Sequence, residues 1–519
     1  MSGERGRVVV VVVDGLRPDA ITGEDAPTLA RLREEGVDFS NSHSVFPTVT
    51  RVNAATLVTG AQPGTHGIVG NEMYVPAVEP ARAFSTQDHR RLVRLDEVTG
   101  GRLTLVPTLA ERLHARGLRL AAVSSGSTGS AWLLNPRAAS GVGALVNGYF
   151  DPGRRVAYPD DLNRTILEKF GPAPAKGGER YDAVVTWTQR VLRDHVLPAL
   201  DPAVVVAWLT EPDHTQHAIG VGTPPARAAI RHADREIAAL LETLETLRLT
   251  NAVNLIVASD HGFTGNTAGV DVAGELVAAG LKASRESDDV VLASSGQAVG
   301  LHVRGRDPER IARIVRFAHS REWGGVLFTA GRAPDDARGA VEGTFSLELI
   351  HVANAERGPD VLLTFPWTSA KRFGMRGTDL ANVAAGGTPY AGDHGSMSPW
   401  NVRNTLLAWG SHFKAGARVA TPAGNVDVTP TILALLGLDT AGLDGRVLEE
   451  ALGDGPDPER VAVETTTHPP AAGEYRAAIQ VSTVAGAATS TKAGESGDRA
   501  AHSYLYGCVC WAQGGEDSS

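Results

Sequence analysis

Continuous apolar runs, without polar alternation, mark four segments in the first half of the chain. These runs are 7–15, 118–126, 203–213 and 251–262. Uninterrupted β-branched and aliphatic residues of this kind are typical of strands buried on both faces of a parallel sheet. Segments with helical periodicity accompany them at 26–36, 107–117, 181–200 and 225–247. This alternation predicts an α/β fold with a mostly parallel central sheet flanked by helices on both faces.

Beyond residue 265 the elements become shorter. Strand-like segments at 295–305 and 325–331 surround a helical segment at 307–320, which indicates a smaller α+β insertion or cap. The core pattern returns at 403–410 and in a helix at 428–438. We therefore predict that residues 1–265 form the first segment of the catalytic core, 266–385 an insertion or cap, 386–480 the second segment of the core, and 481–519 a C-terminal tail.

The C-terminal tail is rich in Ala, Gly, Ser and Thr, which favours a loosely ordered segment, apart from an edge strand within 474–483. The chain has two cysteines, Cys508 and Cys510, and both lie in this tail. Two cysteines cannot stabilise a fold of 519 residues through disulfide bonds. A single C-x-C pair is a weak indication of a metal site.

Composition narrows the class of protein. Hydrophobic residues make up 42% and charged residues 21% of the chain, as in an ordinary soluble globular protein. The formal charge of −10 argues against a general nucleic-acid binder, but a small anionic substrate is allowed where metal ions outweigh the net charge locally. The apolar run Val8–Val13 is too short to span a membrane or to serve as a signal peptide. We therefore expect a cytoplasmic protein without membrane association.

Three of the predicted strands run into an aspartate, namely Asp14, Asp213 and Asp260. The carboxyl ends of parallel strands meet at one edge of a sheet, where ligands bind in open α/β folds. Three carboxylates at that edge would repel one another unless they bind cations or are protonated. The pattern therefore predicts a site at this edge that holds positive charge.

Histidines accompany these acids. His217 follows Asp213 by four residues, close enough to share one metal if a helical turn begins there, and His261 follows Asp260 directly. A further histidine, His394, lies far downstream in the sequence GDHGS. Mixed carboxylate and imidazole ligands suit zinc, with manganese or iron as alternatives.

A cluster of threonines lies at the expected start of a helix, in FPTVTRVNAATLVTG over 46–60. One interpretation is helix capping, because threonine and asparagine accept hydrogen bonds from first-turn N–H groups. The other is that a threonine acts as a nucleophile on an anionic group, which a helix N-terminus favours. A threonine hydroxyl is too weakly acidic to attack unaided, and two metal ions would activate it and stabilise a leaving oxygen in phosphoryl transfer. Thr50 is one of the hydroxyls near the expected site.

Five blocks of the chain together resemble the alkaline phosphatase superfamily, and most closely its nucleotide pyrophosphatase/phosphodiesterase branch. In chain order they are VVVDGLRPD, PTVTRVNAATLVTGAQPGTHGI, EPDHTQHAIG, ASDHGF and GDHGS. The resemblance covers roughly residues 7–265 and 385–440. It implies two zinc ions. One would be held by Asp213, His217 and His394, and the other by Asp14, Asp260, His261 and the nucleophile Thr50.

The resemblance also implies a reaction and a substrate. Thr50 would attack phosphorus and expel an alcohol or nucleotide, and the phospho-threonine would then be hydrolysed, while Asn53 hydrogen-bonds a phosphoryl oxygen. Relatives often stack a base on an aromatic residue directly after the nucleophile, but here that residue is Arg51. A second stacking position falls on Trp208. We expect Arg51 either to contact the substrate, a small phosphate ester, or to pair with a nearby carboxylate.

Related activities remain as alternatives. Monoester phosphatases and phosphonate hydrolases of the superfamily resemble this chain but add cations after the third strand, whereas 121–135 has no Lys or Arg. That absence favours a diester, although Arg51 could compensate. Sulfatases need a Cys or Ser in a formylglycine motif, and no cysteine lies near residue 50. A non-catalytic metal-binding protein is a further alternative, which the complete ligand set disfavours.

Overall fold

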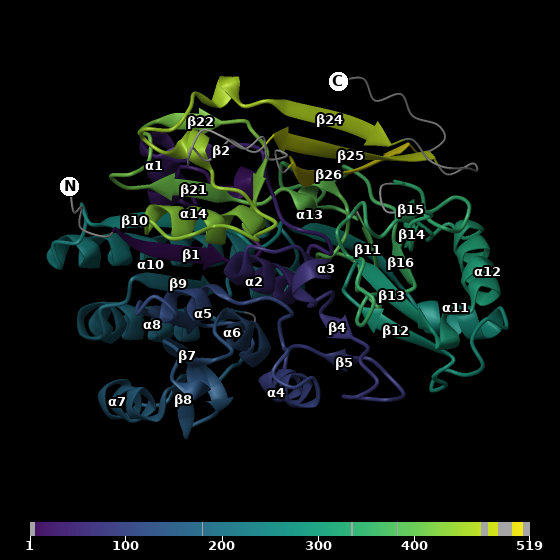
Figure 1. Ribbon diagram of the computed structural model, residues 1–519, viewed down its shortest axis with the longest axis horizontal. Coiled ribbons are helices and arrows are strands. Elements are labelled where there is room, and N and C mark those ends of the chain that lie inside the picture. The colour runs from purple at the N-terminus through teal and green to yellow at the C-terminus, as the bar shows by residue number, and fades with distance from the viewer. Residues whose placement is uncertain are drawn as a thin grey trace, which may run out of the picture.

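A nine-stranded sheet forms the centre of the protein (Figure 1). The structure is a computed structural model, which describes residues 6–178, 180–333, 336–380, 382–468, 476–485 and 501–511. Across the sheet the strands are β22 (Ala417–Val419), β2 (Val37–Phe39), β21 (Leu406–Trp409), β10 (Val253–Ala258), β1 (Arg7–Val13), β9 (Val204–Leu209), β6 (Leu120–Ser124), β7 (Ala144–Asp151) and β8 (Arg155–Tyr158).

The pairing of these strands is mostly parallel. Strand β1 pairs in parallel with β9 and β10, β6 pairs in parallel with β7 and β9, and β2 pairs in parallel with β22. Antiparallel pairing occurs at β21, on both of its sides, and at the far edge between β7 and β8. The predicted fold class, a mostly parallel sheet, is therefore confirmed.

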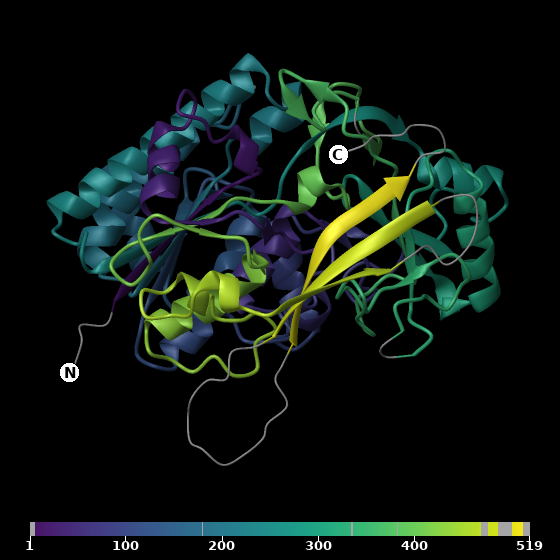
Figure 2. The ribbon, with the colours of Figure 1, turned by 90° about the horizontal axis from the view of Figure 1, so that it is seen from above.

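Both faces of the sheet are buried, which explains the continuous apolar runs. In β1, Val8, Val10 and Val12 pack into one hydrophobic core, while the alternate valines pack into another. Burying one such side chain stabilises the fold by about 1.5–3 kcal/mol. Helices cover each face, as Figure 2 shows with the teal α10 and the yellow-green α14 on opposite sides of the sheet.

The helices divide between the two faces as follows. The core that contains Val9 also contains residues of α1 (Pro27–Glu35), α7 (Asp160–Phe170), α8 (Asp182–Val191) and α10 (Pro224–Thr246). The core that contains Val10 also contains residues of α2 (Thr50–Thr59), α4 (His89–Val98), α5 (Leu109–His114), α6 (Thr128–Leu134) and α14 (Val428–Leu435). The predicted helix at 181–200 continues beyond α8 as a π-helical segment, Leu192–Leu200.

Smaller sheets accompany the central one. A five-stranded sheet contains β12 (Val290–Ser294), β13 (Ala298–Val303), β16 (Val361–Thr364), β14 (Leu327–Thr329) and β15 (Phe345–Ser346). Together with α11 (Val272–Ala278) and α12 (Pro308–His319) it encloses a separate hydrophobic core. The strands and helix expected at 295–305, 325–331 and 307–320 are thus β13, β14 and α12. The boundaries 265/266 and 385/386 stay predictions.

Short elements link this second region to the central sheet. Strand β11 (Thr264–Val270) lies between β19 (Asn382–Ala385) and β20 (Gly392–Asp393). Further short pairs are β3 (Ser42–His43) with β23 (Ala423–Gly424), β4 (Glu72–Met73) with β5 (Phe84–Ser85), and β17 (Lys371–Arg372) with β18 (Met375–Arg376). The remaining α-helices of the described residues are α3 (Pro63–His66), α9 (Asp213–Ile219) and α13 (Pro399–Val402).

The C-terminal segment corrects two expectations. The strand expected within 474–483 is β25 (Arg476–Ala485), but it is central to a three-stranded sheet rather than an edge, with β24 (Val463–His468) and β26 (Ala501–Trp511) as neighbours. The expected loose tail contains β26, and its segments 486–500 and 512–519 lie outside the described residues. The side chains of Cys508 and Cys510 are likewise outside the description.

None of the described helices combines the length and the apolar character that crossing a membrane requires. The expected cytoplasmic location stays a prediction.

Candidate metal centre

The three strand-end aspartates meet at one edge of the central sheet. Asp14 follows β1, Asp260 lies just beyond β10, and Asp213 begins α9 beyond the end of β9. Because β1 lies between β9 and β10 in parallel, these ends are neighbours. The backbone ties them together, since Asp213 N donates to the carbonyl oxygen of Asp14 over 3.1 Å.

The three predicted histidines join this edge. Asp213 Oδ1 lies 3.5 Å from Nε2 of both His217 and His394, and 4.0 Å from His261 Nε2. His261 Nε2 in turn lies 3.1 Å from Asp260 Oδ2 and 3.6 Å from Asp14 Oδ1. Two overlapping groups could therefore each hold a metal ion, namely Asp213–His261–His394 and Asp14–Asp260–His261.

One oxygen of each aspartate is buried without a hydrogen-bond partner among the described residues. These atoms are Asp14 Oδ1, Asp213 Oδ1 and Asp260 Oδ2, the same oxygens that face the imidazoles. A buried carboxylate oxygen without a partner is costly, because it has lost water and gained nothing in return. Three such oxygens converging on one point fit bound cations.

The histidines are oriented for metal binding. Nδ1 of His217, His261 and His394 lies 3.1, 2.9 and 2.9 Å from the carbonyl oxygens of Gly392, Gly262 and Thr48, respectively. A carbonyl oxygen can only accept, so each Nδ1 donates its hydrogen and leaves Nε2 as the free lone pair. Metal-binding histidines are commonly held in this way. The donor set therefore fits two metal ions.

The electrostatics of the cluster support the same conclusion. Burial, together with the charges of Asp213 and Asp260, raises the pKa of Asp14 well above its ordinary value. Burial also works to raise the pKa of Asp213, but His217 and the other imidazoles hold it below its ordinary range. Although burial opposes it, the Asp213 carboxylate raises the pKa of His217 to about 9. The carboxylates of the cluster therefore have too little positive charge near them, and bound cations would supply it.

Thr50 opens helix α2 and faces this cluster. Its Oγ1 lies 3.3 Å from His261 Nε2, and the side chain is 5% exposed. No side chain caps α2, so the capping interpretation of this stretch is wrong. The neighbouring threonines have structural contacts instead: Thr48 Oγ1 donates to Ser396 O, and Thr56 Oγ1 contacts the buried His66 over 2.9 Å.

Asn53 does not fit its predicted role. Its Nδ2 donates to the carbonyl oxygens of Val45 and Val49, and its Oδ1 accepts from Val45 N and Asn425 Nδ2. These four bonds use the full capacity of an amide, and the side chain is 0% exposed. The expected hydrogen bond to a phosphoryl oxygen therefore disagrees with this geometry, and Asn53 instead anchors the loop before α2.

Sequence reasoning missed Asn71, which lies beside the nucleophile position. Its Oδ1 accepts from Arg51 N over 3.3 Å, one residue after Thr50. This bond orients the amide, and its Nδ2 has no hydrogen-bond partner among the residues that the structure describes, so it is available to a ligand. Asn71 directly precedes β4 in a connecting segment, so only its contact with α2 identifies it. No spacing or composition signal pointed to it.

Trp208 also corrects an expectation. The ring is 0% exposed, and its indole N–H donates to Asp14 Oδ2 over 2.9 Å. A ring without exposed surface offers no face to a substrate base. The structure instead gives Trp208 a role in orienting Asp14, whose other oxygen is the unpartnered Oδ1.

Arg51 lies near the cluster rather than in a surface ion pair. Its Nε donates to Thr86 Oγ1 over 3.4 Å, and no carboxylate of the described residues forms a salt bridge with it. Burial lowers the pKa of Arg51, and Asp213, Asp14 and Asp260 partly offset this effect. The expected pairing with a nearby carboxylate is therefore absent among these residues, and the guanidinium is left for a ligand.

Asp393 is a second residue that sequence reasoning missed. Its Oδ1 lies 3.9 Å from His217 Nδ1 and accepts from His394 N over 2.8 Å. With His217 and His394 it forms a third group that could hold a metal ion. The sequence GDHGS contained the signal, because the acid directly precedes the predicted ligand His394.

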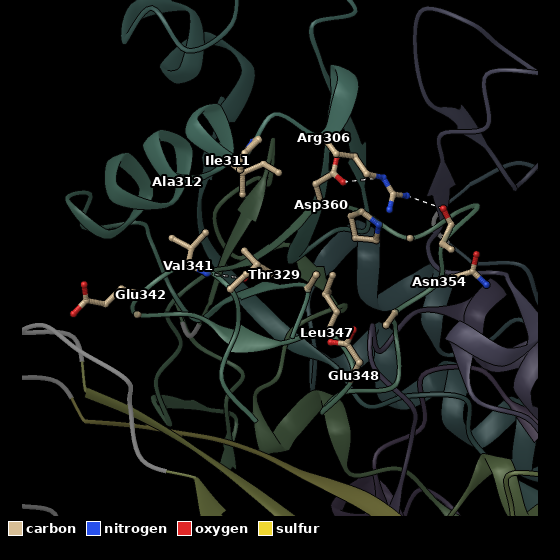
Figure 3. Close-up of a pocket in the computed structure, with 18 of the residues that line it drawn as sticks. Arg306, Ile311, Ala312, Thr329, Val341, Glu342, Leu347, Glu348, Asn354 and Asp360 are labelled. Atoms are coloured by element: carbon tan, nitrogen blue, oxygen red, sulfur yellow. Dashed lines mark hydrogen bonds and ion pairs between the residues drawn. The ribbon is translucent and has the colours of Figure 1, made fainter. Parts of the chain in front are cut away.

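One cavity lies away from this centre. It has a volume of about 930 Å³ and lies over the five-stranded sheet, as Figure 3 shows with Ile311, Val341 and Leu347 around it and Arg306 beside Asp360. None of the described residues that line it is a candidate metal ligand. The chemistry of the centre is therefore separate from this cavity.

A second cavity, of about 630 Å³, lies closer to Arg51. Ser85 and Gln87 line it and flank Thr86, whose hydroxyl contacts Arg51. Ser127 and Lys176 also line it. The structure thus brings a lysine beside the 121–135 segment that has no cation of its own.

The chain is similar to known phosphodiesterases. Residues 8–322 match the family model described as type I phosphodiesterase / nucleotide pyrophosphatase. The chain is 28% identical over 266 residues to a venom phosphodiesterase of Naja atra, covering 50% of this chain and 26% of that protein. It is 27% identical over 253 residues to ectonucleotide pyrophosphatase/phosphodiesterase family member 1 of Mus musculus, covering 48% and 23%. The matches thus span about a quarter of these relatives.

Solved structures share the fold. Murine ectonucleotide pyrophosphatase / phosphodiesterase 5, an inactive variant in complex with AMP, superimposes with a TM-score of 0.59 and 18% identity, covering 86% of this chain and 100% of that one. The human protein of the same name gives a TM-score of 0.58 at 18% identity with the same coverage.

The family match covers more than half of the chain. The protein therefore belongs to the type I phosphodiesterase/nucleotide pyrophosphatase family, as the five sequence blocks indicated.

Proposed function

We propose that this protein hydrolyses phosphodiester or pyrophosphate bonds of small molecules, with Thr50 as the nucleophile. The observation that carries the proposal is the position of Thr50 Oγ1, 3.3 Å from His261 Nε2 at the start of α2 and beside three unpartnered carboxylate oxygens. Family membership supports the reaction class.

The residues of the centre would hold two metal ions, which we propose to be zinc, with manganese or iron as alternatives. Asp213, His217 and His394 would bind one ion, since Asp213 Oδ1 lies 3.5 Å from Nε2 of both histidines. Asp14, Asp260 and His261, with Thr50 beside them, would bind the other. Such a pair of cations lowers the pKa of a hydroxyl and stabilises charge on phosphoryl oxygens.

The protein's own groups would carry out the remaining steps. Thr50 Oγ1 would attack phosphorus as the P–O bond to the leaving group breaks, and its proton would pass by way of solvent to the leaving oxygen. Water would then attack phosphorus as the P–O bond to Thr50 breaks, and a proton from that water would return to Thr50 Oγ1. The N-terminus of α2 and the Nδ2 of Asn71 would donate to the phosphoryl oxygens, since both lie beside Thr50. Arg51 would pair with a further oxygen.

A nucleotide substrate is the class that we propose. One relative of the same fold was solved in complex with AMP, which supports a nucleoside phosphate for this chain as well. A phosphomonoester or a phosphonate is the second candidate. Arg51 is a cation near the centre, and Lys176 lines the cavity next to Thr86, the hydrogen-bond partner of Arg51; the extra charge of a monoester would require such cations.

The test compares paired substrates on the metal-loaded protein. Matched aryl esters, one a diester and one a monoester, should show a higher kcat/KM for the diester, and metal analysis should give about two ions per chain. Fewer than one ion, with no gain on adding zinc or manganese, would contradict the metal assignment. Much faster monoester cleavage would replace the diesterase by a phosphomonoesterase.

A further inference from the structure

Two aromatic side chains are the most exposed large hydrophobic groups of the described chain. Phe373 is 49% and Tyr390 is 50% exposed. They lie 17 residues apart in sequence but share one neighbour: the guanidinium carbon of Arg372 lies 4.8 Å from the Phe373 ring centroid and 5.0 Å from that of Tyr390. We call Arg372, Phe373 and Tyr390 the rim patch.

The rim patch carries unpaired positive charge. Lys371 lies directly opposite Arg376 in the β17–β18 pair, with Arg372 beside them. None of these three cations forms an ion pair with a carboxylate of the described residues. Like charges opposite each other destabilise a strand pair, so these cations do not stabilise the hairpin. The arrangement instead suits an anion.

The patch borders the candidate metal centre. A methyl group added at Gly222 would lie 3.4 Å from Phe373 Cβ, and one added at Gly220 would overlap the carbonyl oxygen of Tyr390. Gly220 directly follows α9, the helix that presents Asp213 and His217, and Gly222 lies two residues further along the chain. Tyr390 is therefore packed against the segment that carries two candidate ligands.

The patch is also linked to His394, the third residue that we propose to bind the same ion as Asp213 and His217. Tyr390 precedes His394 by four residues, and the intervening Gly392 provides the carbonyl oxygen that orients His217. Tyr390 N donates to Asn266 O over 3.1 Å, which holds this loop against β11. The patch thus forms part of the wall beside Asp213, His217 and His394.

The backbone at both aromatic residues is held in an uncommon conformation. Phe373 has φ of 53° and Tyr390 has φ of 65°, in the left-handed region that favours glycine. Bulky side chains rarely occur there, and such outliers cluster where a side chain has a functional position. Both side chains are about half exposed.

The expected stacking positions are occupied differently in this chain. The residue after Thr50 is the cation Arg51, and Trp208 is fully buried against Asp14. An aromatic group of the substrate would find no ring at either position. Phe373 and Tyr390 are exposed rings at the rim of the same centre.

We propose that the rim patch binds the portion of the substrate that is both aromatic and anionic, a nucleoside phosphate group, by stacking on Phe373 and Tyr390 and pairing with Arg372. This inference rests on the proposed function, and it places substrate recognition on the hairpin. Stacking of a base on an aromatic ring commonly contributes on the order of tenfold or more in affinity.

The test is calorimetric binding of AMP and of ribose 5-phosphate to the full, metal-loaded chain. The wild type should bind AMP more tightly, and the double variant Phe373→Ala/Tyr390→Ala should lose about tenfold in AMP affinity with ribose 5-phosphate unchanged. The single variant Phe373→Leu, which stays apolar but has no ring, should weaken AMP binding. Phe373→Tyr, which keeps a ring, should bind AMP as the wild type does. Val463→Ala, at a 41% exposed valine on β24, is the matched control.

Each result is decisive. Unchanged AMP affinity in the double variant, or an equal loss for AMP and ribose 5-phosphate, would overturn the inference. An unfolding scan of each variant separates loss of the patch from loss of the fold, and the comparison of Phe373→Leu with Phe373→Tyr answers the question if the double variant is unstable. Because binding needs no turnover, a protein that binds AMP through the patch but cleaves no diester refutes only the proposed function.

Discussion

The candidate metal centre and the rim patch lie side by side and are built in opposite ways. At the centre every candidate ligand except His217 is at least four-fifths buried, and each histidine is oriented by a backbone carbonyl. In the patch the rings are about half exposed, and Arg372 is held by rings rather than by a carboxylate.

This contrast follows from what each region is attached to. The centre lies at the ends of β1, β9 and β10, whose neighbours on both faces are hydrophobic cores. The patch lies on a two-stranded hairpin and a loop. Rigid strand ends suit groups that must keep a fixed geometry during a reaction, and loops suit groups that select a ligand. Variants of the centre should therefore change turnover, and variants near the rim should change substrate preference.

The largest expected effect is at the nucleophile. Thr50→Ala should lower kcat by at least about a thousandfold with metal content unchanged, because it removes the attacking hydroxyl but little buried volume. Thr50→Ser should keep some of the activity, and Thr56→Ser, which keeps a hydroxyl on the same helix, is the matched control. Near-normal rates in Thr50→Ala would mean that water or another residue attacks phosphorus.

An intermediate effect is expected at Trp208, which holds the candidate metal ligand Asp14 in position. Trp208→Phe removes the N–H that donates to Asp14 Oδ2 and should reduce metal affinity or kcat about 10- to 100-fold. Trp187→Phe is the control, because the indole N–H of this buried tryptophan has no hydrogen-bond partner among the described residues. Metal titration followed by kinetics measures both. Equal behaviour of the two variants would contradict the role given to Trp208.

A smaller effect, on preference rather than rate, is expected at Arg51. Arg51→Ala should reduce kcat/KM for a monoester about tenfold more than for a neutral-tailed diester, since a monoester carries nearly one more negative charge. Arg94→Ala, at an exposed position on α4, serves as the control. Steady-state kinetics on the matched pair of esters checks this. If both substrates lost activity equally, Arg51 would be a structural residue.

A last effect concerns stability and lies outside the comparison of centre and patch. Burial, with a contribution from Arg357, lowers the pKa of His66 from 6.5 to about 3. Between those values the unfolded chain binds a proton that the folded chain does not, so stability falls as pH decreases from about 6.5 toward 3, by on the order of 1 kcal/mol per pH unit.

Urea unfolding at several pH values measures this slope. His66→Gln should flatten it, although His43, whose pKa burial also lowers to about 3, keeps some of it. An unaltered slope in His66→Gln would show that His66 is protonated as readily in the folded chain as in the unfolded one.

The sequence alone was sufficient for the sheet and for the residues that gather at its edge. Continuous valine runs predicted strands buried on both faces, and the acid after each run predicted where Asp14, Asp213 and Asp260 meet. Both inferences are local: a strand's burial follows from its own residues, and the carboxyl ends of parallel strands must share an edge.

Only the tertiary structure decided how individual polar atoms are used. Asn53 and Trp208 have residue types suited to a substrate, yet their hydrogen-bonding groups are taken by the loop at Val45 and by Asp14. Asn71 and the rim patch reach the site through chain segments distant in sequence. A sequence states which groups are present, but their partners depend on contacts made across the fold, because a buried donor or acceptor bonds to whichever group packing brings within reach.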